Sequence, residues 1–163
     1  MNIRLESPAD RCAIHAVHAA CFPTPYEADL VDALRHAGRL SISLVAAQEA
    51  EVVGHVAFSP VTAPGGAAGM GLGPVAVLAS WRRRGIAAQL IRAGLDQCAE
   101  SRHGFVVVLG DPRYYQRFGF RPAGRWGWHD EFGGGDAFQA LELRPGVIPA
   151  GAGAVRYAPE FTA

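Results

Sequence analysis

The spacing of apolar residues predicts a short opening strand followed by two helices. Residues 2–6 have an extended pattern, and Ser7 then precedes a proline, the usual order of a helix N-cap and a first helical residue. Thr24 precedes another proline in the same way, so one helix should run to about Phe22 and a second should follow Thr24. Gly38 is placed to end the second helix, because glycine readily adopts the left-handed conformation found at helix C-termini.

Three strands are predicted next, and the third contains a proline. The runs 42–47 and 52–61 are β-rich, and Pro60 should weaken the second of them. The run 71–78 has the sequence GLGPVAVL, in which Pro74 has no amide to donate to a neighbouring strand. We therefore expect a bulge or an unpaired edge at Pro74 and a strand that is locally splayed.

The second half of the chain alternates helices and strands. Apolar residues recur at helical spacing over 85–101, and 105–109 is a continuous apolar strand of the kind that is covered on both faces. Asp111 should cap a short helix that ends near Gly119, and 138–143 should form a last strand after an irregular loop at 125–136. The whole pattern predicts one α/β domain over residues 1–163 with the element order β-α-α-β-β-β-α-β-α-β-β.

Composition narrows the functional classes. Half of the 163 residues are hydrophobic, and 15 basic residues balance 15 acidic ones, so a general polyanion binder is disfavoured. Cys12, Cys21 and Cys98 form no CxxC pair, and we expect three core thiols, no metal site and a reducing cytoplasmic location. No uninterrupted apolar run is long enough to span a membrane, which needs about 18 residues or more.

The strongest local signal lies where the third of these strands meets the long helix. Arg82, Arg83 and Arg84 directly precede Gly85 at the start of that helix. Free amides and the positive end of the dipole bind anions there, and cations at this end are unfavourable without an anion. The turn therefore predicts a bound phosphate or an acidic partner, with a solvated basic turn as the alternative. The chain lacks lysine and GxGxxG, which excludes a P-loop or Rossmann site.

A second signal is a tyrosine on the predicted short helix. Tyr115 lies on the first turns after Asp111, beside a strand end, where a phenol can reach a cleft. A neutral phenol can donate a proton to a leaving group. The alternative is that the aromatic residues of this stretch simply fill the core.

In combination, these two signals resemble the GNAT N-acetyltransferase superfamily. The sequence RxxGxA at Arg82–Ala87 follows a strand with an internal proline, and YxxxGF at Tyr115–Phe120 follows the next strand. LGPVAVL, GDPRYYQRFGF and FQALEL further resemble its compact bacterial members of largely unassigned substrate. The resemblance implies an α+β mixed sheet that is mostly antiparallel, flanked by helices and splayed at Leu72–Leu78. It leaves a homodimer open.

The resemblance also implies site residues. The backbone of Val75, Ala76 and Val77 would bind the pantetheine arm of acetyl-CoA, and Tyr115 would protonate the departing thiolate. An amine would attack the thioester directly, with a backbone amide near Val77 polarising the carbonyl. The pyrophosphate would be held by the turn residues Arg82, Arg83, Arg84, Gly85, Ile86, Ala87 and Ala88. Many relatives carry asparagine where this chain has Asp111, whose role as an N-cap is sufficient explanation.

The general base and the acceptor stay open at this point. Three alternatives for the general base are equal: His55, Glu27 and a water relay. His55 shares a strand face with Ser59. We expect the acceptor pocket to form from 22–27 and 126–132. The expected contacts are Phe22, Tyr26, Glu27, His55 and Trp128. Aromatic and acidic residues there would suit a small amine with an apolar body.

The function predicted is therefore acetyl transfer from acetyl-CoA to a primary amine of a small molecule or peptide. We expect neither a nucleic acid nor a membrane as a binding partner. Two alternatives are a non-catalytic acyl-CoA-binding module on the same fold and a nucleotide- or RNA-binding domain that uses Arg82–Arg84. The zero net charge disfavours the second alternative.

Overall fold

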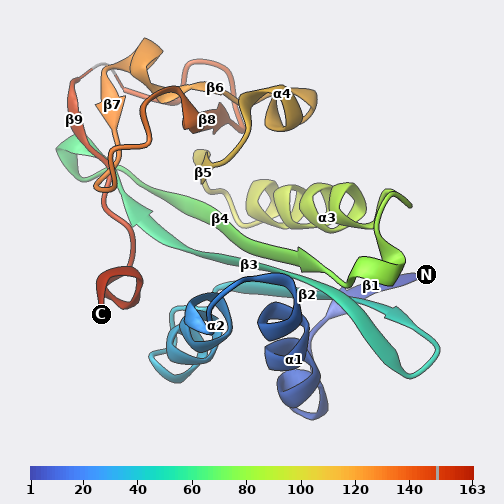
Figure 1. Cartoon of the computed structure of the whole chain (residues 1–163). Coiled ribbons are helices and arrows are strands. Elements are labelled where there is room, and N and C mark those ends of the chain that lie inside the picture. Colours follow the sequence, from blue (N-terminus) through green and yellow to red (C-terminus); the bar gives the residue numbers. More distant parts are fainter. Residues whose placement is uncertain (150) are drawn as a thin grey trace.

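A seven-stranded sheet with helices on both faces forms the centre of the computed structural model, which describes residues 1–149 and 151–163. Its strand order is β1-β2-β3-β4-β5-β8-β6, and α1 and α2 cover the face opposite α3 (Figure 1). The helices are α1 (Arg11–Cys21), α2 (Tyr26–His36), α3 (Ile86–Glu100) and α4 (Pro112–Tyr115). The strands of this sheet are β1 (Asn2–Leu5), β2 (Ile42–Gln48), β3 (Glu51–Thr62), β4 (Ala68–Val77), β5 (Phe105–Leu109), β6 (Arg121–Pro122) and β8 (Phe138–Glu142).

The sheet is mostly antiparallel and opens between β4 and β5. These two strands run parallel and pair only over Met70–Leu72 and Val106–Val108. Beyond Leu72, β4 continues to Val77 with β3 on one edge and no strand of the described residues on the other. On the other side of β4, the register with β3 shifts between Val56 and Phe58, opposite Pro74. The expected splay and bulge at Pro74 are thus confirmed.

Close packing on the α3 face depends on a glycine. A Cβ on Gly94 would lie 2.1 Å from Cε1 of Phe58, a buried residue of β3. Only a residue without a side chain therefore lets α3 approach the sheet this closely. Cys98 of the same helix is buried, as expected, but Cys12 is exposed and Cys21 is half-buried. The prediction of a core thiol was wrong for Cys12, because that position of α1 faces solvent.

Two further details differ from the sequence-based expectation. Pro60 was expected to weaken β3, but the strand continues through it to Thr62, and Pro60 pairs with Met70 of β4. The expected irregular loop at 125–136 contains a short strand, β7 (Trp128–His129). This strand pairs in parallel with β9 (Gly153–Ala154), so a distant part of the chain supplies its hydrogen-bond partners. Within the described residues, no helix is both long and apolar enough to cross a membrane.

A buried polar chain joins α1 to the sheet. Nε2 of His18 lies 2.8 Å from Nδ1 of His55, and Nε2 of His55 lies 2.7 Å from Oγ of Ser43. The Ser43 hydroxyl donates to Glu6, whose carboxylate also accepts two hydrogen bonds from Arg35, at 2.8 and 3.0 Å. Hydrogen bonds from Arg35 and Ser43 outweigh the opposing desolvation and lower the pKa of Glu6, so this carboxylate accepts only.

The ionised carboxylate sets the proton positions along the chain. Because Ser43 must donate to Glu6, its oxygen accepts from Nε2–H of His55. Nδ1 of His55 is then a lone pair that accepts from Nε2–H of His18. Burial lowers the pKa of His18 to about 4, and burial with the nearby His18 lowers the pKa of His55 well below its usual range. Both histidines are therefore neutral at pH 7.

These pKa shifts predict that the folded state loses stability as the pH falls from 7 to 5. In that range the unfolded chain protonates His18 near its ordinary pKa of about 6.5, whereas the folded chain does not. His18 alone should lower the free energy of unfolding by about 2 kcal/mol at pH 5. Urea unfolding should show a smaller fall for His18→Gln, which cannot titrate there, and His36→Gln on the exposed side of α2 is the control. Equal falls in wild type and His18→Gln would contradict the assignment.

Candidate active site

Two cavities border the part of β4 that is no longer paired with β5. One, of about 360 Å³, is lined by Leu72, Gly73, Pro74 and Val75 of β4 together with many aromatic residues, and we call it the aromatic cavity. The other, of about 250 Å³, lies at the start of α3, and we call it the arginine cavity. It is lined by Val77, Trp81, Arg82, Arg83, Gly85, Ile86, Ala87, Ala88, Tyr114 and Arg117.

The free edge of β4 presents amides that no strand uses. Leu78 donates its amide to Val53 of β3 at 2.9 Å. Because backbone directions alternate along a strand, the amides of Val75 and Val77 face the opposite edge, where β5 has already parted from β4. Ala76 differs from these two valines, since its amide faces β3 and its side chain packs in the core beneath α1. The amides of Val75 and Val77 are thus available for the expected role, whereas Ala76 lines neither cavity.

The arginine cavity has the geometry of an anion site. Gly85 directly precedes α3 and has a φ of +75°. The hydrogen bonds of the helix begin with the amide of Gln89, which donates to the carbonyl of Gly85 at 3.0 Å. The amides of 86–88 precede it and are left for a ligand at the positive end of the helix dipole. Arg82 is anchored at the cavity by Nε, which donates to the Val77 carbonyl at 3.0 Å.

Arg84 points elsewhere. Its guanidinium carbon lies 4.8 Å from the centre of the Trp81 ring, and Nη2 donates to the Ser80 carbonyl at 3.4 Å. It does not line the arginine cavity, so of the three expected arginines only Arg82 and Arg83 do. Trp81, Tyr114 and Arg117 line it as well and were missed, since the motif that predicted the turn does not include them.

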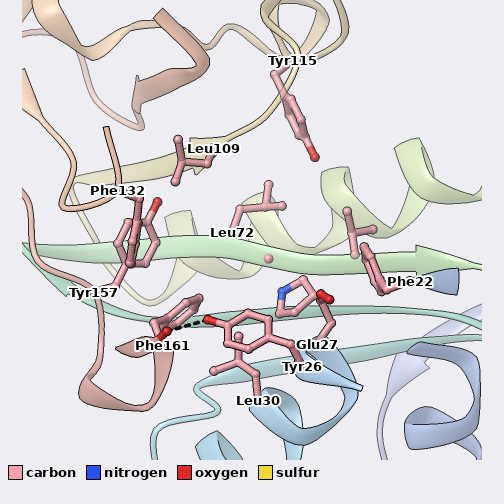
Figure 2. Close-up of a pocket in the computed structure, with 13 residues that line it drawn as sticks. Phe22, Tyr26, Glu27, Leu30, Leu72, Leu109, Tyr115, Phe132, Tyr157 and Phe161 are labelled. Carbon is pink, nitrogen blue, oxygen red and sulfur yellow. Dashed lines mark hydrogen bonds between the residues drawn. The ribbon is translucent and has the colours of Figure 1, made fainter. Parts of the chain in front are cut away.

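Tyr115 sits on α4 as expected and lines the aromatic cavity. Asp111 caps this helix, accepting from the Arg113 amide at 2.9 Å, so its predicted N-cap role is confirmed. The Tyr115 side chain is buried, and its hydroxyl points toward β4 (Figure 2). Burial, with a smaller contribution from Tyr114, raises the pKa of Tyr115 to about 12. The phenol therefore remains protonated at neutral pH and can donate a proton.

The opposite wall of the aromatic cavity comes from the first two helices. Figure 2 shows Tyr26 and Glu27 of α2 approaching β4 from the side opposite Tyr115. Phe22, which follows α1, also lines this wall, so three of the five expected acceptor contacts are brought together. Among the described residues that line the cavity, Glu27 carries the one ionisable carboxylate.

Two expected acceptor contacts lie elsewhere. His55 is fully buried in the polar chain beneath α1, and Trp128 is buried against Phe105, with ring centres 4.9 Å apart. Neither lines the aromatic cavity, which corrects the expectation for both. For His55, strand alternation indicated a face of the sheet but not the layer that covers it. Trp128 was expected in an irregular loop, but it lies in β7 and packs into the core. The loop after β7 contributes Phe132 to the cavity instead.

The C-terminal segment completes the aromatic cavity and was not anticipated. Tyr157 and Phe161 line it, with ring centres 5.0 Å apart. The Tyr26 hydroxyl donates to the Phe161 carbonyl at 2.6 Å, and Arg39 Nε donates to Glu160 at 2.6 Å. These contacts fasten the end of the chain to α2. The one sequence signal was a pair of aromatic residues four positions apart, which by itself predicts no cavity.

A possible metal cluster lies apart from both cavities. His15, Asp29 and Asp32 on α1 and α2 bring ligand atoms within 4.8 Å of one another. Asp32 is already paired with Arg35 at 3.0 Å and with His15 at 2.7 Å. The three residues line neither cavity, so the site chemistry does not involve them.

Comparison with known proteins agrees with this geometry. The family model for the acetyltransferase (GNAT) domain matches residues 2–123. The chain belongs to the GNAT acetyltransferase family. It is 39% identical over 164 residues to the uncharacterized N-acetyltransferase YhbS of Escherichia coli K12, which covers 99% of this chain and 98% of YhbS. The predicted family and enzyme class, an N-acetyltransferase, are thus confirmed.

Two crystal structures of GNAT proteins are also similar over nearly the whole chain. YhbS from Escherichia coli in complex with CoA has a TM-score of 0.94 at 38% identity, covering 99% of this chain and 92% of that one. A GNAT family acetyltransferase from Brucella melitensis in complex with acetyl-CoA has a TM-score of 0.82, also at 38% identity, covering 98% and 97%. The predicted GNAT fold is confirmed by both.

The family match covers the two cavities to different extents. All residues of the arginine cavity lie within 2–123, whereas Phe132, Tyr157 and Phe161 of the aromatic cavity lie beyond that range. The other described lining residues of the aromatic cavity, among them Tyr115, lie within it. The alignment with YhbS covers 99% of this chain and so extends beyond the family match.

Gly110 should be required for the position of Tyr115. A Cβ on Gly110 would lie 2.3 Å from Cε2 of Tyr115, whose ring is packed against Tyr114 and Phe120. Gly110→Ala should therefore lower the free energy of unfolding by about 1–3 kcal/mol through overpacking. In a Tyr115→Ala background the same change should cost less than about 0.5 kcal/mol. Urea unfolding of the four proteins measures this coupling, and equal costs in both backgrounds would exclude it.

Proposed function

We propose that this protein transfers the acetyl group of acetyl-CoA directly to the primary amine of a small molecule or peptide with an apolar body. One observation carries the proposal. The consecutive residues Tyr114 and Tyr115 line the arginine cavity and the aromatic cavity respectively, on either side of the free edge of β4. A cofactor with its phosphates in one cavity can therefore extend its reactive end along β4 into the other.

The cofactor would occupy the arginine cavity and the edge of β4. The amides of 86–88 and the guanidinium groups of Arg82 and Arg83 suit a pyrophosphate. The pantetheine arm would extend alongside β4 as an added strand, using the amides that Val75 and Val77 leave free. CoA and acetyl-CoA are bound by the two similar GNAT structures from Escherichia coli and Brucella melitensis, which supports this placement.

The reaction would need orientation, polarisation and one proton donor. The nitrogen of the neutral amine attacks the thioester carbon, and the free amide of Val77 or Val75 stabilises the charge that develops on the carbonyl oxygen. The carbon–sulfur bond then breaks, and Tyr115 donates its proton to the departing thiolate sulfur. The raised pKa of Tyr115 keeps that proton available at neutral pH. The nitrogen, which carries a positive charge after the attack, releases a proton to the Tyr115 phenolate through water, so the amide product is neutral and the phenol is restored.

The acceptor would be a cation before it reacts. The described lining of the aromatic cavity contains no lysine or arginine, six aromatic rings and the Glu27 carboxylate. Aromatic faces and a carboxylate attract an ammonium group, and the rings suit an apolar body. Glu27 would pair with the ammonium and take its proton, directly or through a water molecule, before the attack. A screen of amines with acetyl-CoA, following release of the CoA thiol, tests the proposal.

The first test of this proposal is loss of the Tyr115 hydroxyl. Tyr115→Phe should lower kcat by about 100-fold, which is within the usual range for one acid–base group, while the affinity for acetyl-CoA changes little. Steady-state kinetics with the best amine from the screen, together with calorimetric titration of CoA, separates the two effects. Tyr114→Phe is the control, because that neighbour lines the arginine cavity instead. Equal kcat values in wild type and Tyr115→Phe would remove Tyr115 from the mechanism.

The second test concerns the carboxylate in the aromatic cavity. Glu27→Gln should lower kcat/KM for a cationic amine by about tenfold or more, because the substrate loses a charge-assisted hydrogen bond. Asp29→Asn removes an equal charge from the same first turn of α2, outside the cavity, and should have little effect. A screen in which only anionic amines react would contradict the proposed acceptor class. Failure of every amine to release thiol would favour a binding module instead.

A further inference from the structure

Arg117 lines the arginine cavity but lies outside the turn at Arg82–Ala87. It follows α4, whereas the other lining arginines, Arg82 and Arg83, precede α3. Its guanidinium carbon lies 4.2 Å from the centre of the Tyr114 ring, and its Nε donates to the Tyr114 carbonyl at 2.9 Å. The side chain is exposed, so a ligand can reach it.

Arg82 and Arg117 are held in the same way, although Arg82 precedes α3 and Arg117 follows α4. Each uses Nε to donate to a backbone carbonyl, that of Val77 for Arg82 and that of Tyr114 for Arg117. This leaves the two terminal amino groups of each guanidinium for other acceptors. An arginine that is already anchored loses little conformational freedom when it binds a phosphate oxygen.

The charge around Arg117 is unbalanced. Among the ion pairs of the described residues, none involves Arg117. Asp96 and Glu142 border a groove on its other side but make no such pair with it. The described lining of the arginine cavity contains three arginines and the positive end of α3, with no carboxylate. A ligand that brings at least two negative charges would balance this arrangement.

We propose that Arg117 binds the pyrophosphate of the cofactor together with Arg82 and, through its hydrogen bond to Tyr114, fixes the short helix that carries Tyr115. This inference rests on the proposed cofactor. It makes Arg117 a cofactor-binding residue for the phosphates and a positioning residue for Tyr115.

The positioning role follows from the size of α4. The helix spans Pro112–Tyr115, a single turn, and so short a helix gains little stability from its own hydrogen bonds. The carbonyl that anchors Arg117 belongs to Tyr114, the residue before Tyr115. A phosphate that holds Arg117 therefore also holds this turn. Cofactor binding in one cavity would thus order the proton donor in the other before the amine arrives.

Calorimetric titration with CoA and with dephospho-CoA, which lacks the 3′-phosphate, tests the contact. Arg117→Met keeps an apolar stem over Tyr114 and should weaken both ligands by about tenfold. Arg92→Met is the matched control, because Arg92 stacks on Phe118 at 5.0 Å, carries the same charge and lies outside the arginine cavity. It should change both affinities less than about twofold. Thermal melting of each variant reports on folding.

Three outcomes of this titration overturn the contact. They are unchanged affinity in Arg117→Met, an equal loss in Arg92→Met, and a loss confined to CoA, which would indicate the 3′-phosphate instead. If the wild-type protein binds neither CoA nor dephospho-CoA, the proposed function itself is contradicted. This result differs from the three outcomes above, in which the wild type binds and only the role of Arg117 is contradicted.

Hydrogen–deuterium exchange tests the positioning role. Saturating CoA should protect the amides of 113–119 in wild type and in Arg92→Met, but much less in Arg117→Met at equal saturation. The kinetic counterpart is a fall in kcat in Arg117→Met that persists when acetyl-CoA is saturating. Equal protection in all three proteins would overturn the positioning role.

Discussion

The separation of β4 from β5 is the constraint on which the rest of the site depends. Two parallel strands that paired along their full length would bury every backbone amide of β4 and leave no room between them. Here pairing ends at Leu72 and Val108, while β3 continues to hold the other edge of β4 as far as Val77. Strand β4 is thus held by β3 on one edge while its other edge is free. It can offer amides to a ligand without the entropy cost of ordering a loop.

Each cavity then takes its character from the element that fills the opening. On one side the N-terminus of α3 supplies free amides and a positive potential, and the arginines that gather there lack carboxylate partners within the described residues. On the other side aromatic side chains from α2, from the loop after β7 and from the C-terminal segment line the aromatic cavity. Burial raises the pKa of Tyr115, whose ring packs against Tyr114, Phe118 and Phe120, so the packing around α4 keeps the proposed proton donor protonated.

Local sequence signals predicted the structure correctly at positions where the backbone preference of a single residue determines the conformation. Pro74 cannot pair, Gly85 readily takes a positive φ, and Asp111 caps a helix, whatever surrounds them. Side-chain surroundings were predicted less well, because they depend on distant segments. His55 lies on the expected face of its strand, but α1 covers that face and removes it from the cavity. Phe161 closes the cavity only because the end of the chain returns to α2, a contact that no local pattern encodes.

The burial of His55 also explains how the wall formed by Phe22 and α2 keeps its position. The chain from Glu6 to His18 ties β1, β2 and β3 to α1, and Arg35 extends it to α2. Neutral imidazoles linked by directed hydrogen bonds cost less to bury than charged ones, although Nδ1 of His18 has no hydrogen-bond partner among the described residues. The lowered pKa values that keep these histidines neutral also make them weak bases. The buried histidines thus help to hold the wall of the aromatic cavity, and the carboxylate on that wall, Glu27, is the group that we propose pairs with an amine.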